Sequence, residues 1–397
     1  MRPYNVIKYK PHNPTRIYTI LESKVMFPKR KATRSKRKTP ISNQLSAPIM
    51  TSVRLMLSNI FICVSSLFLV STRIVSSRKR ILFMKENNLY NKYSDYLKEK
   101  YGEKVYKLPI NLPITCPNRI NGAGCSFCAE VGTGFEALDS SVSVKEQMQK
   151  TKALIETKYK AKKYIAYFQN YTNTFMPISM FKRYILEAAS EPDIVEISIS
   201  TRPDCIRADY LELLLDIYQT YHININIELG LQTANYHTLD SIDRGHGLAE
   251  FIDAVLQIKK YPFTICTHII LNLPWDDMRD TIENARILSA LHIDIVKLHS
   301  LYIAKNTKLS KQYKDVTITV CSKEEYIDRV IAFLNFLSPD IIVERLFSRV
   351  PEDDAEFSNW NTSWWKLQDD LTEKMRQQNA YQGKNFDYLN GRALNIL

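Results

Sequence analysis

Short apolar segments alternate with longer segments of helical period from about residue 105 onward. Strands are expected where Val and Ile dominate, over residues 105–112, 164–169, 194–200, 223–231, 263–271 and 293–301, with 341–346 as a weaker seventh. Helices are expected between them, over residues 144–159, 178–189, 208–220, 248–259, 279–291 and 323–337. In the fifth helix, Ile282, Ala285 and Leu288 form one apolar stripe. This order predicts an α/β fold with a parallel sheet and right-handed crossovers.

An open doubly wound sheet and a barrel both fit this alternation. No G-x-G-x-x-G follows the first strand, which disfavours a dinucleotide-binding fold. In either architecture the reactive groups lie at the carboxyl ends of the strands. The polar segments FQNYT, STRPD, ELGLQT and LNLPWDD each follow an expected strand. We therefore expect the functional site at that edge of the sheet.

Three of the seven cysteines, Cys116, Cys125 and Cys128, form a C-x8-C-x2-C pattern after the first strand. Thiolates are the natural ligands of iron–sulfur clusters and of zinc. A structural zinc site needs four protein ligands, and no histidine lies nearby in the sequence. A [4Fe–4S] cluster on three cysteines leaves one iron open to a small molecule, whereas a zinc site completed by a distant residue is the alternative. The odd, scattered cysteine count favours a reducing, cytoplasmic compartment.

The net charge of +12 is concentrated in the N-terminal part of the chain. Residues 1–83 contain 17 basic residues and one acid, Glu22, so they carry +16 and the remaining residues carry −4. The charge of the whole chain therefore does not indicate a nucleic-acid partner for the core.

The N-terminal extension, residues 1–83, combines a basic run at 29–38 with an uncharged apolar run at 55–72. Eighteen such residues lie at the lower limit for a membrane span. One interpretation is a membrane segment over 55–72, and membrane contact is expected only in that case. The other is a mis-assigned start or a dispensable extension, with the functional protein beginning at Met84.

Six segments together resemble a known protein family. In order they are KLPINLPITCPNRINGAGCSFCAEVGTG, AYFQNYTNTF, ISTRPDC, IELGLQTANYHTLDSIDRGH, THIILNLPWDD and VKLHSLYIAKNT. They resemble radical S-adenosylmethionine (SAM) proteins of the YhcC/YtqA-like family, relatives of the Elongator catalytic-subunit-like enzymes. The resemblance runs from about Met84 to Gly383 and implies a partial (β/α)6 barrel of the TIM type. It divides the chain into a lead-in at 84–104, a core barrel at 105–345 and a C-terminal α/β appendage at 346–397.

The resemblance also implies a [4Fe–4S] cluster and SAM as cofactors. Cys116, Cys125 and Cys128 would bind three irons, and SAM would bind the fourth, although the usual spacing is C-x3-C-x2-C. Further cofactor contacts are implied for Phe127, Asn170, Thr172, Ser200, Gln232, Arg244 and His268. Taken without the resemblance, Gln232 and Arg244 also fit a loop hydrogen bond and a surface ion pair, and His268 fits a core histidine.

The chemistry implied is reductive cleavage of SAM to a 5′-deoxyadenosyl radical that abstracts hydrogen from a substrate. Related enzymes point to tRNA, at a wobble uridine, and an electron donor such as flavodoxin or ferredoxin is expected. Seven lysines between Lys145 and Lys163 predict a helix face able to meet phosphates, with a merely solvated face as the alternative. The competing functions are a radical SAM enzyme acting on a small molecule or peptide, and a zinc-stabilised RNA-binding module without catalysis.

Overall fold

The computed structural model describes residues 88–120, 122, 124–129, 137–349 and 354–396. All of them belong to the unit formed by residues 68–397. The extension 1–83, including the apolar run 55–72, lies outside the described residues. Within the described ranges, no helix has the length and the apolarity that crossing a membrane requires.

Seven parallel strands form one sheet in which spatial order follows chain order. They are β1 (Val105–Ile110), β2 (Lys163–Phe168), β3 (Ile194–Thr201), β4 (Asn224–Gln232), β5 (Thr264–Ile270), β6 (Ile295–His299) and β8 (Ile342–Arg345). Every neighbouring pair is parallel. The weak seventh segment expected from the sequence is therefore a strand of the same sheet.

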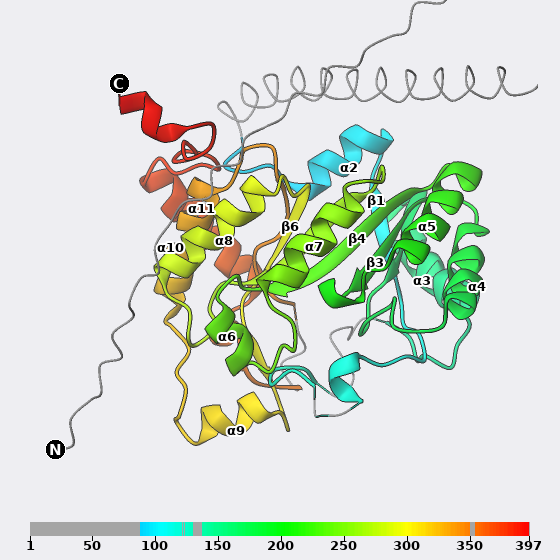
Figure 1. Ribbon diagram of the computed structural model, residues 1–397, viewed down its shortest axis with the longest axis horizontal. Coiled ribbons are helices and arrows are strands. Elements are labelled where there is room, and N and C mark those ends of the chain that lie inside the picture. Colours follow the sequence, from blue (N-terminus) through cyan, green and yellow to red (C-terminus); the bar gives the residue numbers. More distant parts are fainter. Residues whose placement is uncertain (1–87, 121, 123, 130–136, 350–353, 397) are drawn as a thin grey trace, which may run out of the picture. The chain divides into compact units, whose positions relative to one another are not determined.

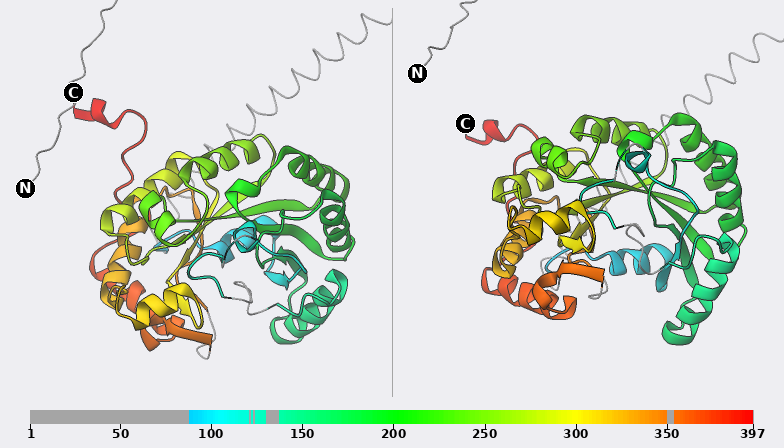
Figure 2. Two further views of the ribbon diagram at one scale, coloured as in Figure 1. Left: turned by 60° about the horizontal axis from the view of Figure 1, so that its bottom comes forward. Right: turned by 90° about the horizontal axis from the view of Figure 1, so that it is seen from below.

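Six long helices follow the strands and lie outside the sheet (Figures 1 and 2). They are α3 (Val144–Tyr159), α4 (Ile178–Ala189), α5 (Ala208–Tyr221), α7 (Leu248–Ile258), α8 (Met278–Ala290) and α10 (Lys323–Phe336). In α7 the buried residues Phe251, Ala254, Val255 and Ile258 recur at helical spacing. The apolar core therefore lies between the helices and the outer face of the sheet.

The first and last strands of the sheet approach each other, which distinguishes a partial barrel from an open sheet. Lys107 on β1 contacts Glu344 on β8 at 2.7 Å and Glu228 on the central strand β4 at 2.8 Å. These three side chains can meet only if the sheet curls around them, as Figure 2 shows. The helix α2 (Tyr93–Tyr101) contacts both β1 and β8. The expected partial barrel is confirmed.

The remaining elements include a two-stranded sheet, two short helices and a C-terminal helix. The strands β7 (Tyr302–Ala304) and β9 (Ala355–Ser358) form an antiparallel pair, and the short helices are α6 (Tyr236–Ser241) and α9 (Lys308–Lys314). Helix α11 (Trp364–Gln377) packs against α10. At the start of α9, the Leu309 amide donates to the Ser126 carbonyl at 2.9 Å. This segment therefore packs against the cysteine loop.

Candidate functional site

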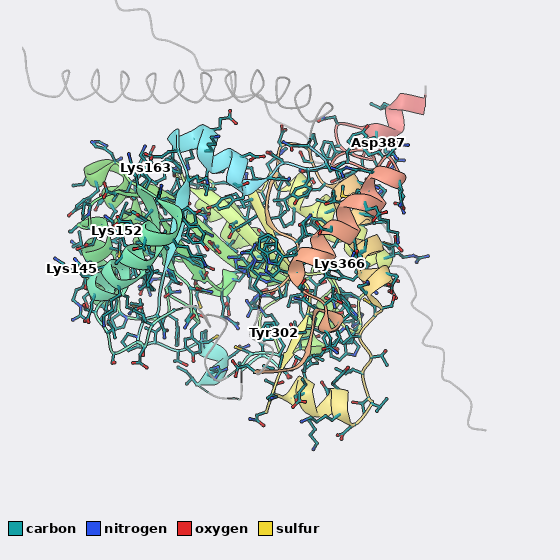
Figure 3. The ribbon with its side chains drawn as sticks, turned by 180° about the vertical axis from the view of Figure 1, so that it is seen from behind. Lys145, Lys152, Lys163, Tyr302, Lys366 and Asp387 are labelled. Atoms are coloured by element: carbon teal, nitrogen blue, oxygen red, sulfur yellow. The ribbon has the colours of Figure 1, made fainter. Side chains whose placement is uncertain are left out.

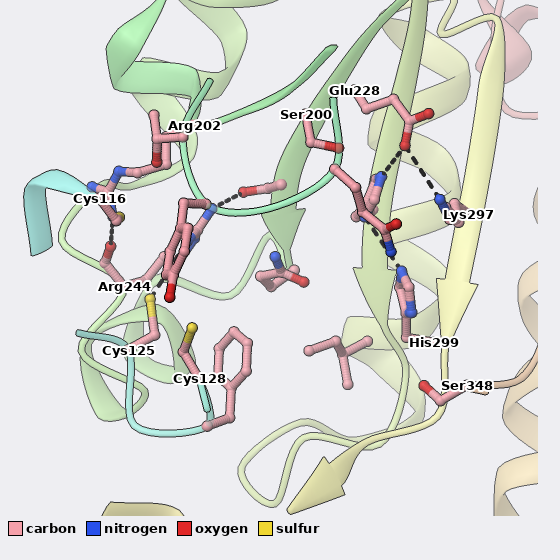
Figure 4. A pocket seen from close by; sticks show the side chains of 18 of the residues that line it. Cys116, Cys125, Cys128, Ser200, Arg202, Glu228, Arg244, Lys297, His299 and Ser348 are labelled. Atoms are coloured by element: carbon pink, nitrogen blue, oxygen red, sulfur yellow. Dashed lines mark hydrogen bonds and ion pairs between the residues drawn. The ribbon is translucent and has the colours of Figure 1, made fainter. Parts of the chain in front are cut away.

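A cavity lies at the carboxyl ends of the strands, with about 1210 Å³ of empty space including its open mouth. Figure 4 shows the cysteines on one side of it and Glu228, Lys297 and His299 on the other. Nearly all of the predicted site residues line it, namely Cys116, Cys125, Phe127, Cys128, Thr172, Ser200, Gln232, Arg244 and His268. Asn170 is the exception: it is buried but is not part of the lining. The structure therefore brings the cysteine loop, the turn after α6 and the ends of β2 to β5 together at a single cavity.

The cysteine loop is seated on the turn that follows α6. Asn118 donates through Nδ2 to the carbonyls of Asp243 at 2.9 Å and Arg244 at 2.8 Å. The Ser126 amide donates to the Ile242 carbonyl at 2.9 Å. Gly245 has a positive φ of 72°, and its missing Cβ leaves the space that Asn118 fills. The sequence segment IDRGHG therefore serves as the platform for the loop.

Each of the three cysteine sulfurs lies close to an arginine side chain. The pairs are Arg244 Nη1 with Cys125 at 3.4 Å, Arg119 Nη2 with Cys128 at 3.5 Å and Arg202 Nη1 with Cys116 at 4.0 Å. Guanidinium groups are permanently charged and stabilise nearby negative charge. The guanidinium groups therefore favour an anionic group at the sulfurs, and Arg119 opposes the burial that raises the pKa of the Cys128 thiol.

Arg244 is held by a close backbone approach. Its Nη2 donates to the Gly230 carbonyl at 2.6 Å, and a Cβ at Gly230 would lie 2.8 Å from that nitrogen. The Nε of Arg244 is buried and has no hydrogen-bond partner among the described residues. Gln232 lies beside it at the end of β4, with a φ of 78° after a bulge in the pairing with β5. Both predicted residues thus face the cavity next to the cysteines.

The turn after β2 is organised by Asn173, which the sequence analysis did not single out. Its Nδ2 donates to the carbonyls of Phe168, Asn170 and Ser200. Thr172 reaches the cavity from this turn, whereas Asn170 contributes its carbonyl to the turn. The segment contains no glycine, but the buried side-chain amide of Asn173 holds the turn by donating to three backbone carbonyls.

The wall opposite the cysteines carries charged and imidazole groups. Glu228 on β4 contacts Lys297 on β6 at 3.3 Å and His268 on β5 at 2.8 Å, and His299 contacts His268 at 3.3 Å. Burial alone would raise the pKa of Glu228, but Lys107 and Lys297 hold it well below its usual range. Of this group the sequence analysis named only His268. Charged residues inside otherwise apolar, buried strands were the signal that could have found the others.

The lysine-rich segment forms α3 and the start of β2 (Figure 3). Four of its seven lysines are paired with acids, namely Lys145 with Glu191, Lys150 with Glu146, Lys152 with Asp193 and Lys163 with Glu103. Lys158, Lys160 and Lys162 are exposed, and no ion pair joins them to the described residues. They lie beside the start of β2, at the edge of the sheet opposite the cysteines. Three of the seven lysines are therefore exposed and have no ion pair among the described residues.

Two family models match successive parts of the chain. The Radical SAM superfamily model matches residues 110–285, and the Radical_SAM C-terminal domain model matches residues 293–377. The uncharacterized protein MJ0486 of Methanocaldococcus jannaschii is 32% identical, over 76% of this chain and 94% of its own length. The uncharacterized protein YtqA of Bacillus subtilis is 30% identical over the same shares of the two chains.

The fold is similar to that of a solved structure, the archaeal Methanocaldococcus infernus Elp3 with an N-terminal deletion. The TM-score is 0.55 at 15% identity, over 70% of this chain and 64% of that one. Over a shorter stretch of 161 residues, the chain is 24% identical to a tRNA uridine(34) acetyltransferase of Methanocaldococcus jannaschii. This stretch covers 39% of this chain and 28% of that protein.

Proposed function

Since this chain belongs to the radical SAM superfamily and is therefore an enzyme that uses a [4Fe–4S] cluster and SAM, we propose that Cys116, Cys125 and Cys128 hold the cluster and that the substrate is a tRNA. The observation that carries the cluster assignment is the convergence of the three sulfurs, each beside a guanidinium, on one wall of the cavity. When bound, the cluster supplies the electron for cleavage of SAM.

The donor set fits such a cluster. Thiolate ligands give an iron–sulfur cluster net negative charge, and nearby hydrogen-bond donors stabilise it. Arg119, Arg202 and Arg244 provide these donors, each to a different cysteine. The loop also supplies Phe127, which is buried and lines the cavity beside the sulfurs. The protein's part is to orient the cofactors and to keep water away from them.

Arg244 is the best-supported contact for the carboxylate of SAM. Two of its nitrogens are engaged by Gly230 and Cys125, while the buried Nε has no partner among the described residues. A buried guanidinium N–H left unpaired is costly, and a carboxylate oxygen would satisfy it. Gln232, on the same wall, lies within the cavity as a second hydrogen-bonding group for the cofactor.

The tRNA assignment is supported by the partial likeness to a tRNA uridine(34) acetyltransferase. A second support is the exposed group Lys158, Lys160 and Lys162, because unpaired lysines are available to phosphates. A tRNA is large enough to contact this edge of the barrel while one nucleotide enters the cavity. The proposal therefore separates a docking surface from the reacting site.

The cluster assignment is tested by metal analysis after anaerobic reconstitution. We expect iron and acid-labile sulfide in the ratio of a [4Fe–4S] cluster, lost in Cys125→Ala and retained in Cys205→Ala. Cys205 is a suitable control because it is partly buried but lies outside the cavity lining. Zinc uptake without iron would overturn the enzyme assignment and favour a zinc-stabilised RNA-binding module.

The tRNA assignment is tested in two ways. Nucleosides of tRNA from cells with and without the gene should differ, and an unchanged profile would contradict the proposal. In vitro, charge reversal of Lys158, Lys160 and Lys162 to Glu should weaken tRNA binding and reduce its salt dependence. The matched control reverses three exposed lysines on other elements, Lys98, Lys182 and Lys260, and should have a smaller effect.

A further inference from the structure

The wall opposite the cysteines contains a hydrogen-bonded chain to which the proposed function assigns no role. It runs from Glu228 through His268 to His299, on three adjacent strands of the barrel. His299 is half-buried and lines the cavity (Figure 4). The chain therefore ends at a ring that lines the cavity.

The direction of this chain is fixed at its buried end. Glu228 is fully buried and accepts from Lys107 at 2.8 Å, from Lys297 at 3.3 Å and from Ser198 Oγ at 2.5 Å. An ionised carboxylate can only accept hydrogen bonds. His268 Nε2, 2.8 Å away, must therefore be the protonated nitrogen of its ring.

The rest of the chain follows if both rings are neutral. Burial lowers the pKa of His268, and burial together with His268 and Arg345 lowers the pKa of His299 well below its usual value. A neutral His268 must then accept at Nδ1, so His299 donates from Nε2 across the 3.3 Å contact. The remaining nitrogen, His299 Nδ1, carries a lone pair and acts as an acceptor.

The same cavity also contains a hydrogen-bond donor. Arg345 on β8 lines the same cavity and lies close enough to lower the pKa of His299. Among the described residues its guanidinium has no ion pair and no hydrogen bond. Lys297, by contrast, is saturated, since Tyr167, Glu228 and Glu344 lie 3.1 to 3.3 Å from its nitrogen. The cavity is thus lined by an acceptor on His299 and by a donor on Arg345 that has no partner among the described residues, rather than by an anion-binding cluster.

We propose that this wall is a substrate subsite that recognises an N–H beside a carbonyl, as in the imide edge of a uracil ring. The N–H donates to His299 Nδ1, and the carbonyl oxygen accepts from Arg345. His268 and Glu228 are positioning residues that keep the His299 lone pair facing the cavity. The inference rests on the proposed tRNA function, because it places the base of a nucleotide opposite the cysteines.

The experiment uses the full-length reconstituted enzyme with SAM and three nucleosides as probes. Uridine carries the imide N–H, 3-methyluridine lacks it, and cytidine presents an acceptor at that position. By calorimetry we expect uridine to bind about tenfold or more tightly than the other two, which is the loss typical of one unsatisfied buried hydrogen bond. Equal binding of uridine and 3-methyluridine, or no uridine binding by iron-replete protein that binds SAM, would overturn the inference.

Variants connect this discrimination to the residues. His299→Leu should abolish the preference for uridine over 3-methyluridine, whereas His299→Asn, which keeps an acceptor oxygen, should retain part of it. His268→Phe should also reduce the preference, although His268 touches no probe. Without the hydrogen bond to His268, either ring nitrogen of His299 can carry the proton. A preference that survives His299→Leu at normal iron content contradicts the proposal.

The outcome separates this inference from the proposed function. If uridine is discriminated but the tRNA profile is unchanged, the subsite stands and the tRNA assignment is wrong. If the tRNA profile changes but 3-methyluridine binds like uridine, the function stands and the subsite assignment is wrong. Low iron in the unmodified protein would contradict the cluster assignment alone.

Discussion

Arg244 connects three parts of the cysteine site. Its side chain contacts Cys125 and the Gly230 carbonyl, and its own carbonyl accepts from Asn118 at 2.8 Å and from Arg202 at 2.8 Å. One residue thus joins the loop that bears the sulfurs to strand β4 and to the turn after β3. Substitution of Arg244 should therefore change the properties of the cluster more than it changes the stability of the fold.

We expect Arg244→Lys to make the midpoint potential of the cluster more negative. The ammonium cannot reproduce both hydrogen bonds, and loss of a donor to a ligand sulfur favours the oxidised cluster. Redox titration followed by electron paramagnetic resonance measures the change, and Arg207→Lys, an exposed arginine paired with Asp209, is the control. An unchanged potential at full iron content would contradict the assigned contact.

Asp276 should make stability depend on pH. The residue is 5% exposed, its carboxylate accepts from Thr238 Oγ1 at 2.5 Å, and burial raises its pKa to about 6. Because the folded state binds this proton more tightly than the unfolded state, its contribution to stability is full below about pH 4. That contribution is lost as the pH rises through about 6.

The corresponding variant is Asp276→Asn. We expect it to flatten the fall in the free energy of unfolding between about pH 4 and 6, and to stabilise the protein at pH 7 by about 1–3 kcal/mol. Denaturant unfolding at a series of pH values measures both effects relative to the unsubstituted protein. Asp216→Asn, at an exposed position, should leave the pH dependence as it was.

At this scale the sequence predicted the three cysteines and six of the other residues that line the cavity, because they lie in short motifs. It did not reveal the role of Glu228 or Lys297. Glu228 meets Lys107, 121 positions earlier in the chain, and Lys297 meets Tyr167, 130 positions earlier. These residues meet only because the sheet curls into a partial barrel, and the pattern of neighbouring residues in the sequence does not predict such distant contacts.

The long elements agree with the periodicity of the sequence, and their ends are set by identifiable caps. Helices α3 and α4 occupy the predicted residues, and Ser143, Asp277 and Ser322 accept backbone N–H groups at the starts of α3, α8 and α10. The elements missed are α11, which has fourteen residues, and shorter ones such as α2, α9 and the β7–β9 pair, which have three to nine. Segments of this length depend on tertiary contacts more than on their own periodicity.

The capping box of α8 gives a prediction at the scale of one element. Asp277 accepts from the amides of Arg279 and Asp280, and Asp280 accepts from the amide of Asp277. We expect Asp277→Ala to lower the free energy of unfolding by about 1 kcal/mol. Asp277→Asn, which preserves a capping oxygen, should stay close to the unsubstituted protein in the same denaturant titration. Equal losses for both variants would contradict the capping role.

For the whole molecule, the question is where the functional chain begins. We expect a chain that starts at Met84 to bind iron and to unfold at the same temperature as the full-length protein. A chain that starts at Lys104 should be much less stable, because it lacks α2 with its buried residues Tyr93 and Leu97. Iron analysis and thermal unfolding of the two shortened chains make the comparison. Loss of iron from the Met84 chain would show that residues 1–83 are required.

The ion pairs inside the barrel also have a consequence for the order of folding. Lys107 and Glu344 are 237 positions apart, and Glu228 and Lys297 complete the same buried group. In a chain that has assembled only some strands, these charges would lack partners and resist removal from water. We therefore expect water to leave the barrel interior only when the last strand, β8, joins the sheet. Strands β1 and β8 should then acquire hydrogen-exchange protection together and late in refolding.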